Sequence, residues 1–100
     1  MSYADWNTAA RRLAILELLV KAGGEAASRA LEWGLKQSSH RVGVDSNVVT
    51  ADLRWLESVM TVELEYPEPT IAYAKITKRG VQVAKGAVAV EGIAQPDIGV

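Results

Sequence analysis

Residues 45–80 read DSNVVTADLRWLESVMTVELEYPEPTIAYAKITKRG, and this stretch decides the fold. Its first part is typical of an amphipathic helix. Asp45 or Ser46 can cap that helix, because a short polar side chain accepts a backbone N–H of the first turn. Aliphatic side chains then recur at the spacing of one helical face, at Val49, Leu53 and Leu56. The sequence therefore predicts a helix that begins after Asp45 or Ser46 and buries one side.

The second part of the stretch predicts a two-stranded hairpin. Thr61–Tyr66 alternates with a period of two, with aliphatic residues on one face and acidic residues on the other. Ile71–Ile76 is expected to pair back onto it. Pro67 and Pro69 are expected at the tip, where the missing N–H of proline costs no hydrogen bond of the ladder.

A short last helix and a tail follow the hairpin. Thr77 can cap this helix, which is expected to turn Val81 and Ala84 inward and to end near Gly86. Residues 87–100 contain further glycines and a proline, and they predict a C-terminal tail. Aliphatic side chains that can dock the tail on the domain are Val88, Val90 and Ile93.

Two helices are predicted before residue 45. The first covers about Asn7–Ala22 and ends at Gly23-Gly24, and the second covers about Ala26–Gln37. The apolar side of the first helix comprises Ala9, Leu13, Leu16 and Val20, widened by Ile15, Leu18 and Leu19. Three helices, a hairpin and a short helix are the order of a winged helix-turn-helix domain. The prediction is a mainly α domain over residues 1–86 with a small antiparallel hairpin.

Composition limits the class of protein. One hundred residues make one domain, and 49% hydrophobic residues are ordinary for a globular chain. Cysteine is absent, so disulfides and thiolate chemistry are excluded. The most apolar stretch, Leu13–Val20, contains Glu17 and is too short to span a membrane. A net charge of -1 gives no overall attraction to nucleic acid.

Several segments resemble one protein family. They are Arg11-Arg12-Leu13-Ala14-Ile15-Leu16, Ala51-Asp52-Leu53-Arg54-Trp55-Leu56-Glu57, Ile76-Thr77-Lys78-Arg79-Gly80, Val83-Ala84-Lys85-Gly86 and Gly92-Ile93-Ala94-Gln95-Pro96. Together they are similar to a small winged-helix protein of Mu-like phages and prophages, with an ArsR-like winged helix. The resemblance implies a phage-encoded protein in the bacterial host cytoplasm, with a fold like that of small transcriptional regulators. It implies no particular activity and no functional residues.

Polar residues form a stripe on the side of the third helix that lies opposite its apolar face. Asn47, Thr50 and Arg54 share that side, with Ser46 at the start of the helix. Asn can pair with adenine and Arg with guanine through two hydrogen bonds each, so the stripe fits a recognition helix in the major groove. An ordinary solvated helix face has the same pattern. The basic residues that could reach phosphates nearby are Arg41, Lys78 and Arg79.

The local charge opposes this interpretation. Between residues 45 and 68 the chain has six acidic residues and one basic residue, Arg54. Because neutralisation of phosphates supplies most non-specific affinity for DNA, an acidic hairpin would repel the backbone. A protein partner for the hairpin is the alternative.

Asp52 falls inside the apolar face of the third helix. A buried carboxylate needs a partner, because unpaired burial is costly. Arg11, Arg12 or a helix N-terminus could supply that partner, and a structural ion pair is the expected role.

Trp6, Trp33 and Trp55 are large anchors for so small a domain. Trp55 is expected in the core. The other two either pack on the tail or form a homodimer interface, where aromatic residues are enriched.

Enzymatic activity is not expected. No nucleophile has a matching base, since His40 is the single histidine and no Ser lies in a Gly-x-Ser-x-Gly elbow. One histidine without cysteine does not favour a zinc site, and no phosphate-binding glycine loop is present. No cofactor and no metal are expected. The leading prediction is a phage-encoded protein that binds double-stranded DNA, either a transcriptional regulator or a DNA-packaging accessory. The alternative is a protein-interaction module in phage assembly that uses the acidic hairpin and does not bind DNA.

Overall fold

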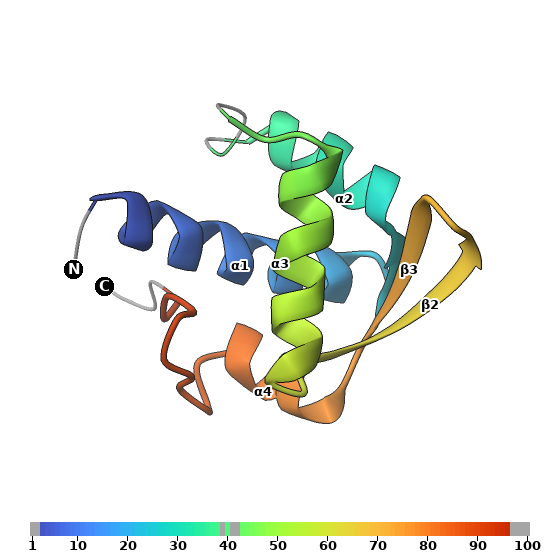
Figure 1. Ribbon diagram of the computed structural model, residues 1–100. Coiled ribbons are helices and arrows are strands. Elements are labelled where there is room, and N and C mark those ends of the chain that lie inside the picture. The colour runs from blue at the N-terminus through green and yellow to red at the C-terminus, as the bar shows by residue number, and fades with distance from the viewer. Residues whose placement is uncertain (1–2, 39, 41–42, 97–100) are drawn as a thin grey trace.

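The computed structural model describes residues 3–38, 40 and 43–96. The elements are α1 (Tyr3–Lys21), β1 (Glu25–Ala27), α2 (Ser28–Lys36), α3 (Ser46–Ser58), β2 (Val62–Glu68), β3 (Ile71–Ile76) and α4 (Lys78–Ala84). Figure 1 shows α1 crossing behind α3. In this view α2 lies above α1, α4 lies below α1 and the hairpin strands lie to one side. The domain is mainly helical, and its three strands form one antiparallel sheet.

The core lies where α1 and α3 cross. Buried aliphatic side chains of α1 are Leu13, Ile15, Leu16 and Leu19, and those of α3 are Val49, Leu53 and Leu56. The predicted face of α3 is thus confirmed, and so is the cap: the Asp45 carboxylate accepts the N–H of Val48 at 2.9 Å. Val20 was predicted to be buried. This prediction is wrong, because the Val20 side chain is 38% exposed. The buried face of α1 centres on Ile15 and Leu19, which turns Val20 to its margin.

The sheet has a third strand that the sequence pattern did not predict. β1 pairs with β3, Glu25 opposite Lys75 and Ala27 opposite Tyr73, so the sheet order is β1-β3-β2. The predicted second helix therefore begins at Ser28 instead of Ala26. Three residues are too few to show a period, and alanine favours helix, so the pairing with the free edge of β3 decided the conformation.

Across the β1–β3 pair, the hydroxyl of Tyr73 donates a hydrogen bond to the Glu25 carboxylate at 2.8 Å. This bond favours the protonated phenol and raises the pKa of Tyr73 above its usual value.

The hairpin differs from the prediction at one proline. β2 continues through Pro67 to Glu68, so Pro67 lies within the strand and the tip is formed by Pro69 and Thr70. The pairing of β2 with β3 shifts register between Glu65 and Glu68. An edge strand tolerates proline at such an irregularity, because the missing N–H is not needed by a second neighbour.

The helix after the hairpin is capped as predicted. The Thr77 hydroxyl accepts the N–H of Gly80 at 3.0 Å. The buried residues of α4 are Gly80, Val83 and Ala84, whereas Val81 is only half-buried, contrary to the prediction. A Cβ on Gly80 would lie 2.2 Å from the carbonyl oxygen of Thr61, so the helix can press against that backbone only with glycine there.

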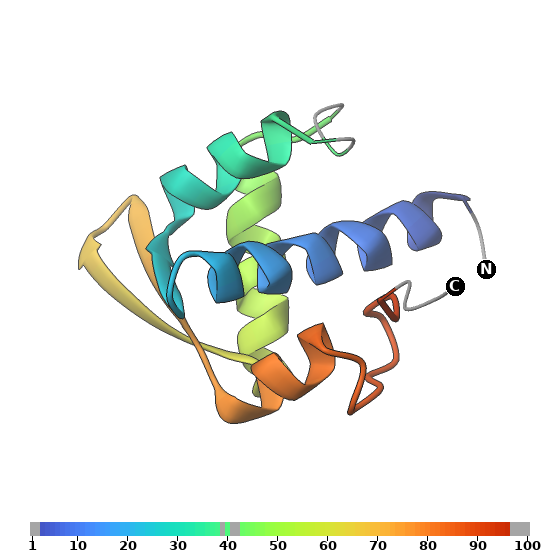
Figure 2. The same ribbon diagram turned by 180° about the vertical axis from the view of Figure 1, so that it is seen from behind.

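The described part of the tail, residues 87–96, packs on the domain. Ile93 is buried in the main core, and Val88 and Val90 pack partly against it, as predicted. The N–H of Ala94 donates to the carbonyl of Ala9 at 3.1 Å, which holds the tail beside the N-terminal half of α1 (Figure 2). The tail is therefore part of the same core as the helices.

Candidate nucleic-acid interface

The outward side of α3 is the candidate interface. Figure 1 shows α3 across the front of the domain with the hairpin beside it, and no described element covers its outward side. Ser46, Asn47 and Arg54 are exposed on this helix, and Thr50 is half-buried. No hydrogen bond or ion pair joins any of these four side chains to another described residue. The polar stripe predicted from the sequence therefore faces solvent.

The other basic residues of the predicted site are not gathered around the start of α3. Arg41 lies outside the described residues. Lys78 and Arg79 begin α4, and the Arg79 Nε donates to the carbonyl of Val59 at 2.9 Å, just beyond the C-terminal end of α3. They therefore lie at the end of the helix that is farthest from Ser46 and Asn47.

The acidic residues of the stretch from 45 to 68 are mostly engaged within the domain. Asp45 caps α3, and the Glu57 carboxylate accepts the N–H of Leu64 at 3.0 Å. Glu65 lies 3.6 Å from the ammonium of Lys75. Asp52 is 3% exposed and cannot face a ligand. Glu63 and Glu68 remain as exposed carboxylates of the hairpin without a described partner.

Asp52 is held by two arginines of α1. The Arg11 guanidinium makes an ion pair with Asp52 and donates a second hydrogen bond to it at 3.1 Å. The Nε of Arg12 lies 3.5 Å from the same carboxylate. Arg12 also stacks 3.8 Å from the centre of the Trp55 ring and donates to the carbonyl of Gly92 at 3.2 Å. The predicted ion pair is confirmed, and it joins α1, α3 and the tail.

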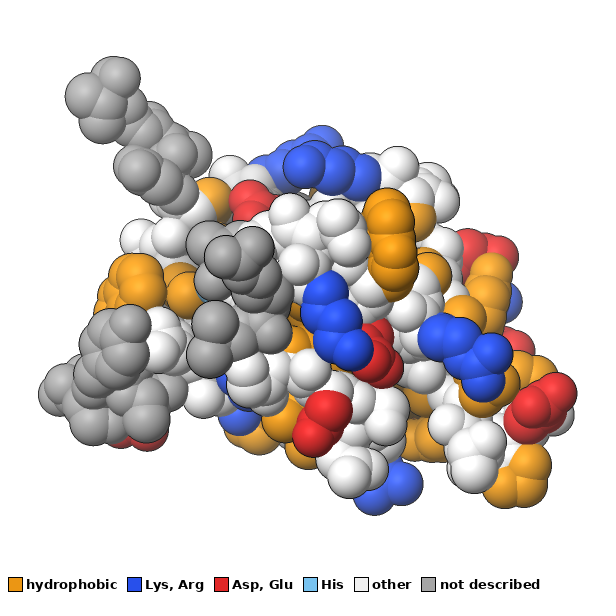
Figure 3. Space-filling view, turned by 90° about the horizontal axis from the view of Figure 1, so that it is seen from above, with side chains coloured by type: hydrophobic (Ala, Val, Ile, Leu, Met, Phe, Trp, Pro, Cys, Tyr) orange, Lys and Arg blue, Asp and Glu red, His pale blue; other side chains and the backbone are white. Residues whose placement is uncertain are grey.

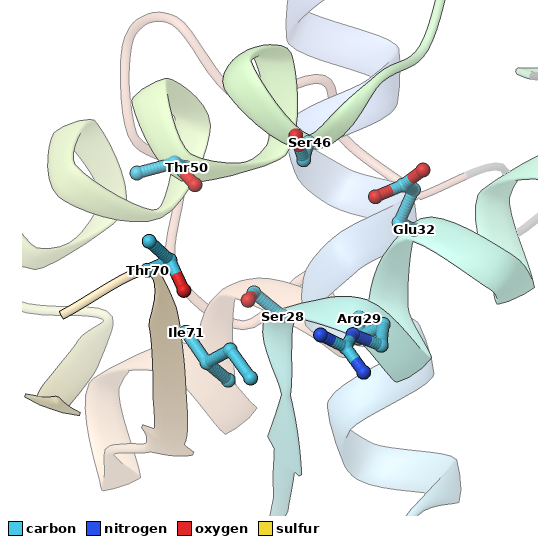
Figure 4. A pocket seen from close by; sticks show the side chains of 7 residues that line it. All are labelled: Ser28, Arg29, Glu32, Ser46, Thr50, Thr70 and Ile71. Carbon is cyan, nitrogen blue, oxygen red and sulfur yellow. The ribbon is translucent and has the colours of Figure 1, made fainter. Parts of the chain in front are cut away.

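A polar pocket of about 330 Å³ opens beside α3. Its lining residues come from α2, α3 and the hairpin: Ser28, Arg29, Glu32, Ser46, Thr50, Thr70 and Ile71. Figure 4 shows these side chains arranged around one hollow. Ser28, Arg29 and Thr70 were not among the residues predicted for the site. Only the pairing of β1 with β3 brings the start of α2 next to the hairpin turn, and no local pattern encodes that pairing.

Trp6 and Trp33 are 57% and 66% exposed. Trp33 borders an apolar hollow of about 260 Å³ between α1, β1 and α2. In Figure 3, which looks down on the molecule from the side of α2, basic side chains stand apart from one another with acidic ones among them. This face therefore shows no continuous basic patch among the described residues.

Within residues 3–38, 40 and 43–96, no group of three or more His, Asp or Glu side chains is placed to hold a metal ion. None of the helices in that part of the chain has the length and apolarity that crossing a membrane requires. Comparison of the chain with protein-family models, with curated proteins and with solved structures found no match.

Proposed function

We propose that the domain is a winged helix-turn-helix that binds double-stranded DNA, with α3 in the major groove and the β2–β3 hairpin as the wing. The order of α2, α3 and hairpin supports this, because recognition helices of this class follow a preceding helix and present their outward side to the bases. The observation that carries the proposal is the polar side of α3, where Asn47 and Arg54 are exposed and have no hydrogen-bond or ion-pair partner among the described residues.

Each residue of the site has a chemical role in the proposal. Arg54 presents a planar guanidinium that can donate two hydrogen bonds to guanine, and Asn47 can pair with adenine. Ser46 and Thr50 contact bases or the adjoining backbone. Lys78 and Arg79, and Arg41 from outside the described residues, supply phosphate contacts at the margins.

The acidic composition of the stretch weighs less against DNA than the sequence implied. Asp52 is buried and cannot meet a ligand, whereas Asp45 and Glu57 accept backbone hydrogen bonds but stay exposed. Glu65 is balanced by Lys75. Glu63 and Glu68 are the exposed carboxylates of this stretch that have no partner among the described residues, so we expect them to contribute most of the repulsion. With the family resemblance, we propose a phage regulator or DNA-packaging accessory in the host cytoplasm.

The test is binding to labelled duplexes of mixed sequence at about 50 mM salt, where the electrostatic contribution is large. Wild type is expected to bind, and Asn47→Ala or Arg54→Ala is expected to weaken the preferred duplex by about 1–3 kcal/mol. Glu17→Gln on α1 is the control and leaves sequence preference unchanged. Absence of binding to every duplex at low salt would refute the proposal.

A second candidate function is a protein-interaction module in phage assembly. The exposed carboxylates Glu63 and Glu68 and the exposed Trp33 favour it, since none is engaged within the described domain. Pull-down with phage proteins tests this function. The mass of the free chain in solution tests whether it forms a homodimer. Loss of a captured protein partner in Trp33→Ala or Glu63→Gln would support this second function. If the protein binds DNA and captures no protein, this function is refuted.

A further inference from the structure

The polar pocket beside α3 has a composition that the fold does not explain. Residues with four hydroxyl groups and one guanidinium line it: Ser28, Ser46, Thr50, Thr70 and Arg29 (Figure 4). Within the described part of the chain, none of these five side chains makes a hydrogen bond or an ion pair. The pocket thus gathers donors that have no partner among the residues described.

The one carboxylate in the lining does not balance the arginine. Glu32 is paired with the ammonium of Lys36, one turn further along α2, at 2.7 Å. Arg29 is exposed and makes no ion pair with any described residue. Hydroxyl donors with a free guanidinium suit an anion with several acceptor oxygens, because arginine donates a planar fork that matches phosphate geometry.

The size and polarity of the pocket restrict the kind of ligand. Its volume of about 330 Å³ is at the low end for pockets that enclose a small organic molecule. Ile71 is the single aliphatic residue of the lining, whereas such pockets are mostly apolar. A lone phosphate group fits this chemistry better than a cofactor.

The position of the pocket connects it with α3. Ser46 and Thr50 belong both to the pocket and to the helix that is proposed to read the groove. A helix in the major groove lies between two phosphate backbones, and contacts to phosphate fix its register without reading sequence. The hollow on the flank of α3 is therefore where a backbone phosphate would lie when Asn47 and Arg54 face the bases.

We infer that this pocket is a phosphate-binding site for the DNA backbone, with Arg29 as its cationic group and the four hydroxyls as additional donors. The inference rests on the proposed function and adds to it a residue and a surface outside the predicted set.

The experiment compares Arg29→Gln with Lys21→Gln in duplex binding across a range of salt concentrations. Both variants lose one positive charge from an exposed helical position, but Lys21 lies outside the pocket. Arg29→Gln is expected to weaken all duplexes by a similar factor, roughly three- to tenfold, and to reduce the slope of log K against log salt by about one. Lys21→Gln is expected to keep the wild-type slope, and Arg29→Lys to recover part of the affinity.

A second measurement does not depend on DNA. Inorganic phosphate is titrated into the free protein while the backbone amides of Ser28, Ser46, Thr50 and Thr70 are followed by NMR. Saturable shifts that disappear in Arg29→Gln support the site. If duplexes bind but the two glutamine variants have the same slope, the inference is refuted and the proposed function stands. If phosphate shifts these amides and no duplex binds, the DNA assignment fails and the pocket takes free phosphate.

Discussion

Asp52 shows how one side chain can look functional in the sequence and prove structural. Its place among aliphatic residues of α3 required a partner, and Arg11 and Arg12 of α1 supply it. Because two arginines face one buried carboxylate, Arg12 can make further contacts. Its guanidinium stacks on the Trp55 ring and donates a hydrogen bond to the carbonyl of Gly92 in the tail. The same residue therefore joins two helices and the tail, and has no access to a ligand.

We predict that Asp52→Ala lowers the free energy of unfolding by about 3 kcal/mol, near the lower end for breaking a buried ion pair, because both arginines keep some contact with water. Urea denaturation should show a lower midpoint with an unchanged slope. Arg54→Ala, on the exposed side of the same helix, is the control and should change stability by no more than about 0.5 kcal/mol. Equal midpoints for wild type and Asp52→Ala would contradict this account.

The tail is the element whose position depends most on a single backbone conformation. Gly92 has φ of 94°, a left-handed conformation that favours glycine. A Cβ at this residue would lie 2.6 Å from the Trp55 ring. The turn thus brings the chain close enough for Arg12 to reach the Gly92 carbonyl and for Ile93 to enter the core.

Gly92→Ala should therefore loosen the tail from Trp55. The conformational strain alone is expected to cost about 1–2 kcal/mol, and the overlap with the ring adds to it. Emission of Trp55, isolated by replacing the exposed Trp6 and Trp33 with Phe, should shift to longer wavelength as water reaches the ring.

Ala89→Ser, at an exposed residue of the same tail, serves as the control for that measurement. It should leave both the emission and the stability unchanged. An unaltered Trp55 spectrum in Gly92→Ala would mean that the tail does not depend on this turn.

Considered as a whole, the molecule separates its charges more than a net charge of -1 implies. Asp52 is buried in an ion pair and Asp45 caps α3, whereas Glu63 and Glu68 are exposed on β2. DNA docked on α3 would pass close to this hairpin. The two glutamates would then act against binding, and their removal should matter more than that of distant acids.

The double variant Glu63→Gln/Glu68→Gln is expected to bind duplex DNA roughly two- to thirtyfold more tightly at low salt, since exposed charge interactions contribute about 0.2–1 kcal/mol each. The gain should vanish as salt screens the charges. Glu17→Gln/Glu91→Gln changes the net charge equally at exposed positions on α1 and the tail. Equal gains in the two double variants would show that hairpin position is irrelevant.

The amino-acid sequence by itself determined the elements whose signals are local. The face of α3, the caps by Asp45 and Thr77, strand Ile71–Ile76 and the partner of Asp52 all follow from side-chain period, hydrogen-bonding capacity or the cost of a buried charge. Each of these features depends on residues close by in the sequence, or on a choice among few possible partners.

Tertiary structure alone decided β1, the inclusion of Pro67 in a strand and the pocket around Arg29. Residues 25–27 have no pattern of their own and became a strand because β3 offered a free edge nearly fifty residues away. That pairing set the start of α2 beside the hairpin turn and so assembled the hydroxyls and the guanidinium. Lys78 and Arg79 follow the end of β3, and Arg79 contacts the chain just beyond the C-terminal end of α3. The side-chain periodicity of one segment does not encode its contacts with a distant segment. The sequence therefore predicted the polar side of α3 but not the pocket beside it.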